Sequence, residues 1–263
     1  NDRSELYFDT VQDKTPIRSF PLDKYEDKKG LVEIFQMPRR DEDDTVITNR
    51  YIAGIDVVDK ARATTSSLPS IIVFDRVTRT IVAEYTGRTD DPKYFYEVCR
   101  RILMFYKATA MYEQNFIGLF NYFVQHNASY LLAETPYQLR NSDTYRPGTN
   151  TSKGIFNSGR INDTGIDYIS SWLLNPINPE SEKLMLNTIY SPAILKELIS
   201  WNKKGNFDRV SALIMLFWYE ETLHKVKTEM SEAKVSFLES NYFAKRGLLP
   251  KKRFDWQDPK DFI

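Results

Sequence analysis

The apolar positions of the first half of the chain fall into short runs rather than long ones. Three such runs lie close together, at residues 51–57, 70–75 and 80–85. They are rich in the β-branched and aromatic side chains that strands favour, and turn-forming residues separate them. The spacing predicts an antiparallel meander of three strands. One further short strand is expected at residues 31–36, inside a charged stretch with little pattern.

A helical period replaces this pattern after Asp91-Pro92, which places a proline in the first turn of a helix. Its apolar side chains recur along one face: Phe95, Val98, Cys99, Ile102, Leu103 and Tyr106. A fourth strand is then predicted at residues 108–113, a second helix at 115–126 and a weak fifth strand at 130–132.

The second half of the chain is predicted to be mainly helical. A polar loop at residues 141–162 precedes a helix that begins at 163 or 164 and ends near 174, and a sixth strand is expected at 186–190. Ser191-Pro192 is typical of a helix start, and that helix is expected to end near 205. The last helix is predicted over residues 208–234.

The order strand-strand-strand-helix-strand-helix-strand, followed by helices, predicts an α/β fold with a mixed β-sheet flanked by helices. This order matches that of RNase H-like proteins. We expect residues 1–48 to form a linker arm, residues 49–235 the RNase H-like domain, and residues 236–263 a basic tail.

Composition and charge narrow the function classes. The formal net charge is zero, so the chain is not a globally basic nucleic-acid binder, and DNA contact would need a local basic surface or metal ions. No apolar run is long enough to cross a membrane. The first residues include neither an initiator Met nor a signal pattern, so we expect a fragment of a longer protein or a processed chain.

The shortage of histidine and cysteine is more informative. With two His and one Cys, zinc sites of the Cys/His kind and hydrolases of the Ser-His-Asp or Cys-His kind are disfavoured. Metal chemistry would have to use carboxylates, which favour hard ions such as Mg²⁺ or Mn²⁺. No phosphate-loop motif is present, so ATPase activity is not expected in this chain.

Three acidic residues stand where carboxylates could bind such ions. Asp56 ends the first strand of the meander, Glu113 ends the fourth strand, and Asp208 begins the last helix. Each also has an ordinary structural interpretation: a turn residue, the end of a strand and a helix N-cap, respectively. Asp75, on the second strand, is interpreted as structural or peripheral.

Several segments, in order, resemble the nuclease domain of the large terminase subunit of tailed bacteriophages. Residues 30–35 with Pro38 resemble the segment that follows the family's ATPase domain, and residues 51–56 resemble its G-[IV]-D strand. Residues 112–118 resemble its E-x-N-x-x-G segment, and residues 207–213 its D-[DR]-x-x-[DS]-A-L helix start. Thr151-Ser152-Lys153 resembles the family's segment ahead of a helix.

The resemblance implies a metal-dependent DNA endonuclease that cuts concatemeric viral DNA during genome packaging, with little sequence specificity. The family's metal-binding acids carry over to Asp56, Glu113 and Asp208, and Asp59 is a weaker candidate for a fourth ligand. The implied cofactor is Mg²⁺ or Mn²⁺, as two ions. The family often has two adjacent acids at the third position, whereas Phe207 and Arg209 flank Asp208 here. The resemblance therefore supports the binding of a second ion less strongly than that of the first.

The implied partners are double-stranded DNA, an upstream ATPase motor domain of the same protein, the portal and the small terminase subunit, with no membrane. The implied location is the host cell cytoplasm during virion assembly. The best candidates for contact with DNA phosphates are Lys153 and Arg160, with Arg140 and Arg146 weaker, and the alternative for each is solubilising surface charge.

Two other functions remain open from the sequence. One is another RNase H-like nuclease of the resolvase or transposase type. The other is a non-catalytic docking module for portal or capsid.

Overall fold

The computed structural model describes residues 15–58 without 24 and 26, residues 67–140 without 89, and residues 152–238. The chain divides into two compact units, Asn1–Glu221 and Thr222–Ile263. The sheet and the helices packed on it belong to the first unit. A search of the described residues for a helix both long and apolar enough to cross a membrane finds none.

The centre of the first unit is a five-stranded sheet of order β1-β4-β3-β2-β5. The strands are β1 (Glu33–Ile34), β2 (Tyr51–Asp56), β3 (Ser70–Asp75), β4 (Thr80–Thr86) and β5 (Thr109–Tyr112). Strands β2, β3 and β4 form the predicted antiparallel meander, and β1 pairs antiparallel with β4. Strand β5 pairs with β2 in parallel, which makes the sheet mixed.

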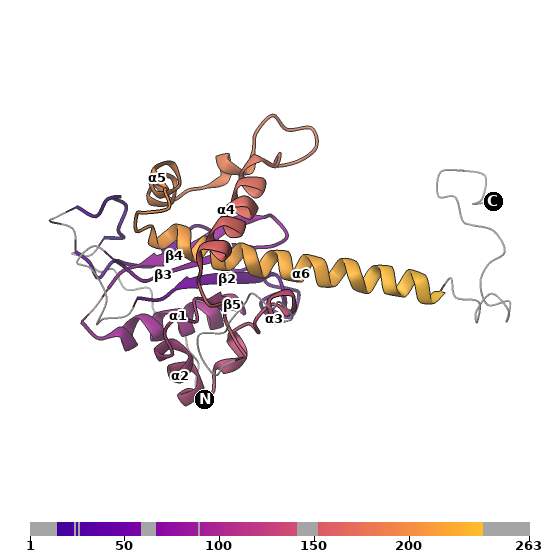
Figure 1. Ribbon diagram of the computed structural model, residues 1–263, viewed down its shortest axis with the longest axis horizontal. Helices are drawn as coiled ribbons and strands as arrows, with labels where there is room; N and C mark the ends of the chain where they lie inside the picture. The colour runs from indigo at the N-terminus through magenta and orange to yellow at the C-terminus, as the bar shows by residue number, and fades with distance from the viewer. Residues whose placement is uncertain are drawn as a thin grey trace. The chain divides into compact units, whose positions relative to one another are not determined.

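The α-helices are α1 (Pro92–Tyr106), α2 (Gly118–Gln125), α3 (Tyr137–Arg140), α4 (Gly159–Leu174), α5 (Pro192–Ser200) and α6 (Asp208–Leu238). Two 3₁₀ helices, η1 (Ser129–Leu131) and η2 (Met185–Thr188), connect them. Figure 1 shows α1 and α2 on one face of the sheet, and α4 and the beginning of α6 on the other.

Burial of the central strands follows from this layering. Every residue of β2, β3 and β4 is buried, as expected for a sheet covered by helices on both faces. On one face, Ala53 and Ile55 join a core cluster with Phe95 and Cys99 of α1. On the other, the Phe74 ring lies 5.5 Å from the Phe217 ring of α6 and 5.8 Å from the Trp172 ring of α4.

The predicted fold class, an α/β fold with a mixed β-sheet flanked by helices, is therefore confirmed. Two predicted strands are wrong. Residues 130–132 form part of a 3₁₀ turn that meets the sheet through a single bridge, Ala110 to Leu132. Residues 186–190 overlap η2, in which Met185 is buried, while Leu186 and Tyr190 are exposed.

Two helix boundaries also differ from the prediction. Helix α4 begins at Gly159, earlier than expected, because the Ser158 side chain caps it by accepting a hydrogen bond from the Ile161 N–H. Helix α5 ends at Ser200, before the polar residues that the prediction had included.

Candidate active site

Asp56 and Glu113 lie beside each other at the carboxyl ends of neighbouring parallel strands. Asp56 is the last residue of β2, and Glu113 follows β5 directly. The register pairs Ile55 with Tyr112, and the Glu113 N–H donates to the Ile55 carbonyl at 3.1 Å. In open α/β sheets this edge is where ligands usually bind. Both side chains are less than a tenth exposed.

Asp208 comes to this edge on the first turn of α6. Helix α6 packs directly on β2, since a Cβ added to Gly54 would lie 2.0 Å from the Ala212 carbonyl oxygen. The Asp208 carboxylate is held by the Leu68 N–H at 3.0 Å and the Ser67 hydroxyl at 3.2 Å. It is 6% exposed. The fold thus brings the three predicted acids, far apart in sequence, to the same end of the sheet.

Burial disturbs the ionisation of all three acids, and repulsion by neighbouring carboxylates adds to it for Asp56 and Glu113. Burial, then the charges of Glu113 and Asp208, raise the pKa of Asp56 well above its usual range, and Asp56 shares a hydrogen bond with Glu113. Burial also raises the pKa of Glu113, against hydrogen bonds from Asp56 and Asn157. Burial raises the pKa of Asp208 to about 6, against the hydrogen bond from Leu68. The ion pairs between described residues include none of these carboxylates.

This arrangement suits a divalent cation chemically, but the set of ligands is not complete as it stands. Adjacent buried carboxylates are a typical site for a hard cation, which would replace the proton shared by Asp56 and Glu113. Yet no three His, Cys, Asp or Glu side chains in the described part of the chain are arranged so that they could hold a metal ion.

The structure gives the E-x-N motif a physical meaning that the sequence did not reveal. The Asn115 side-chain oxygen accepts from the Asn157 N–H at 3.0 Å, and the Asn157 side-chain amide donates to Glu113 Oε2 at 3.2 Å. Asn115 thereby holds the segment after residue 152 beside β5, and Asn157 orients the Glu113 carboxylate. Asn157 has no sequence signal of its own, because the contact joins residues 44 positions apart.

A second group of charged residues is buried next to Asp208, and its members form ion pairs with one another. The Arg209 guanidinium contacts Glu197 at 2.9 Å and Glu84 at 3.3 Å, and all three side chains are 2% exposed. Arg209 also donates to the Ile17 carbonyl at 2.5 Å. Burial raises the pKa of Glu197 to about 7, with Arg209 acting in the opposite direction.

The remaining predicted site residues are only partly described. Asp59 and Arg146 lie outside the described residues. Lys153 is engaged within the fold, donating to the Leu132 carbonyl at 2.6 Å and pairing with Glu134 at 3.2 Å. Arg140 pairs with the same Glu134 at 2.7 Å. Arg160 is exposed and lies in the first turn of α4, three residues after Asn157.

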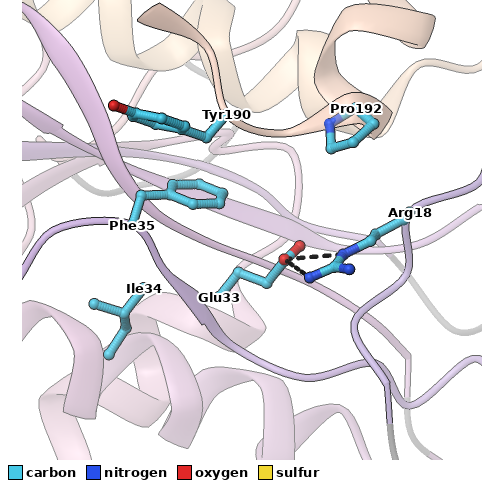
Figure 2. Close-up of a pocket in the computed structure, with 6 residues that line it drawn as sticks. All are labelled: Arg18, Glu33, Ile34, Phe35, Tyr190 and Pro192. Atoms are coloured by element: carbon cyan, nitrogen blue, oxygen red, sulfur yellow. Dashed lines mark hydrogen bonds and ion pairs between the residues drawn. The ribbon is translucent and has the colours of Figure 1, made fainter.

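Two cavities contrast in what lines them. A cavity of about 200 Å³ is lined by residues of the Asp208 and Arg209 region and by residues 19–22. A larger one, of about 450 Å³, is lined by Arg18, Glu33, Ile34, Phe35, Tyr190 and Pro192. Figure 2 shows the Arg18 guanidinium bonded to Glu33, the one carboxylate among these six residues. Of the three predicted acids, Asp208 lines the smaller cavity, and Asp56 and Glu113 line neither.

Comparisons with known proteins find likeness only in structure. No protein-family model matches the sequence, and no curated protein matches it. The crystal structure of the large terminase nuclease from thermophilic phage G20c aligns over 77% of this chain and 90% of its own, at 12% identity and a TM-score of 0.45.

Two further crystal structures of the same phage nuclease match similarly. The form with bound zinc gives a TM-score of 0.45 over 77% of this chain and 90% of its own, at 12% identity. The form with bound magnesium gives 0.43 over 78% of this chain and 90% of its own, also at 12% identity. At 12% identity in each case, the likeness is distant.

Proposed function

We propose that this chain is a metal-dependent DNA endonuclease of the terminase kind, which cuts concatemeric viral DNA during genome packaging with little sequence specificity. One observation carries the proposal: Asp56 and Glu113, buried and sharing a hydrogen bond, end neighbouring parallel strands while Asp208 lies in electrostatic range. Burying three acids together is costly unless protons or cations neutralise them. The motif order in the sequence supports the terminase assignment over a resolvase or transposase.

Asp56, Glu113 and Asp208 would together hold Mg²⁺ or Mn²⁺, as two ions. When bound, the ions supply the Lewis acidity that activates water and stabilises the leaving oxygen. The chain's part is to hold the carboxylates ionised and rigid. Asn157 does this for Glu113, and the Leu68 N–H and the Ser67 hydroxyl do so for Asp208.

The partners follow from this role. Double-stranded DNA would be held through its phosphates, and Arg160, exposed in the first turn of α4, is the candidate that we favour. The upstream ATPase motor domain, the portal and the small terminase subunit are proposed as the protein partners. The proposed location is the host cell cytoplasm during virion assembly.

Cleavage of supercoiled plasmid DNA in Mn²⁺ tests this function. Asp56→Asn keeps the shape of the side chain and removes the charge, so cleavage should fall at least on the order of a hundredfold, because the shared cation ligand is lost. Asp44→Asn is the matched control, since Asp44 is an exposed loop residue, and it should cut like the unmodified chain.

Equal cleavage by Asp56→Asn and the unmodified chain would show that the acids are assigned wrongly. A folded, DNA-binding chain that does not cut under any divalent metal would instead favour the docking module. Preferential cutting of four-way junctions over plasmid would favour a resolvase.

A further inference from the structure

The first turn of α6 lacks a cap from its own sequence. A helix leaves its first N–H groups without partners, and a Ser, Thr, Asp or Asn at the N-cap usually accepts from them. Here Phe207 precedes the helix and has no acceptor in its side chain. The first bond inside the helix is from the Ser211 N–H to the Phe207 carbonyl at 2.9 Å. The N–H groups of Arg209 and Val210 therefore need an external acceptor.

Glu197 of α5 supplies that acceptor. Its Oε2 accepts from the Arg209 N–H at 2.8 Å and from the Val210 N–H at 3.2 Å. Its Oε1 accepts from the Arg209 guanidinium at 2.9 Å. Both oxygens of one buried carboxylate are thus used, and two of their three bonds go to backbone beside Asp208. A carboxylate at this position also complements the positive end of the helix dipole.

Asp208 is consequently fixed from two sides. The Leu68 N–H holds its side chain at 3.0 Å, and Glu197 holds the backbone of the next two residues. A shift in this turn would move the Asp208 carboxylate toward or away from Asp56 and Glu113. The negative charge of Glu197 also offsets the helix dipole, which would otherwise repel a cation beside this turn.

We propose that Glu197 is a positioning residue: by capping α6 from outside the helix, it holds the turn that carries Asp208 at the same end of the sheet as Asp56 and Glu113, the acids that Asp208 would join on a divalent cation. The inference rests on the proposed function. Glu197 itself acts through the backbone of α6 and does not serve as a ligand.

Glu84 provides a matched control for this role. It is buried to the same extent as Glu197 and pairs with the same Arg209 guanidinium, at 3.3 Å. Among the described residues, the backbone N–H groups at the start of α6 bond to Glu197 and not to Glu84. Replacing each by Gln removes one charge beside Arg209, but only the change at Glu197 weakens the cap.

The test measures Mn²⁺ binding by the paramagnetic resonance signal of the free ion, on the full chain, beside plasmid cleavage. Glu197→Gln should weaken Mn²⁺ binding about tenfold and Glu197→Ala up to about a hundredfold, the range seen for residues that support metal ligands. Glu84→Gln should leave Mn²⁺ affinity within about twofold of the unmodified chain. Equal losses in Glu84→Gln and Glu197→Gln would overturn the proposal in favour of simple charge neutralisation of Arg209.

Amide hydrogen exchange in the unmodified chain tests the cap by Glu197 even if the variants do not fold. The Arg209 and Val210 amides should exchange slowly, like amides inside the helix, and Glu197→Gln should accelerate them about tenfold or more. Fast exchange of both amides in the unmodified chain would overturn the cap.

If Mn²⁺ binds and Asp56→Asn abolishes cleavage while Glu197→Gln changes neither affinity nor exchange, this inference fails and the proposed function stands. If the unmodified chain binds no Mn²⁺, both fail together.

Discussion

The chemistry of the site depends on single side chains that hold the acids rather than on the acids alone. Asn157 donates to Glu113 and is itself fixed by Asn115. The hydrogen bond to Glu113 favours the ionised carboxylate, so it opposes the effect of burial on the pKa of Glu113. A carboxylate that is easier to ionise is a better ligand for a divalent cation.

Asn157→Ala should therefore raise the Mn²⁺ concentration needed for half-maximal cleavage, on the order of tenfold, with a smaller effect on the rate at saturating metal. Cleavage rates across a Mn²⁺ titration measure both quantities. Asn121→Ala, on the exposed side of α2, serves as the control and should leave the titration unchanged. A titration curve for Asn157→Ala that overlays the unmodified one would remove Asn157 from the site.

At the scale of elements, the position of Asp208 depends on how closely α6 lies on β2. Gly54 makes this contact possible, because a Cβ there would lie 2.0 Å from the Ala212 carbonyl oxygen and 2.6 Å from the Leu216 backbone nitrogen. Both atoms belong to helix backbone and cannot turn aside as a flexible side chain would. The first turns of α6 must move if this glycine is replaced.

Gly54→Ala should consequently lower the free energy of unfolding by about 3 kcal/mol, within the upper range for overpacking a core, and abolish cleavage. Gly159→Ala makes the same chemical change in the first turn of α4, where nothing lies within 4 Å of the added Cβ, and should be neutral or slightly stabilising. Urea denaturation of the two variants tests the pair. Equal stability of both would mean that α6 does not press on β2 as described.

The comparison of sequence with structure is also clearest for elements. The meander could be predicted because its strands, such as residues 70–75, carry a strong local pattern bounded by turns. The strand predicted at 186–190 failed because a short apolar run does not distinguish a strand from a 3₁₀ helix. The acids could be proposed from strand ends and motif order, but Glu197 could not. Its role depends on contacts 12 and 13 positions away, between two separate helices.

For the whole molecule, a buried group of acids makes stability depend on pH and on cations. The folded pKa of Asp208 is raised from 3.8 to about 6, so the folded chain holds this proton more tightly than the unfolded chain does. The contribution of Asp208 to stability is therefore greatest below its unfolded pKa and is lost as pH rises toward 6. The raised pKa values of Asp56 and Glu113 act in the same direction.

Without divalent metal, the Asp208→Asn variant should become more stable relative to the unmodified chain as pH rises from about 4 to 6, because the amide does not titrate. The difference in their free energies of unfolding should change by an amount on the order of 2 kcal/mol. Chemical denaturation at several pH values measures the difference between the two proteins. Mn²⁺ at pH 8 should stabilise the unmodified chain more than the variant. A difference in stability that stays constant with pH would contradict the burial of an ionisable Asp208.

The contacts of the first turn of α6 also join distant parts of the chain. Arg209 bonds to the Ile17 carbonyl, 192 positions earlier, and Asp208 bonds to Leu68, 140 positions earlier. Such long loops close late in folding, since their entropic cost comes before any gain from the contact. During synthesis, Asp56 and Glu113 therefore leave the ribosome well before the helix that brings Asp208 to them, and the acidic group is completed only after α6 has been made.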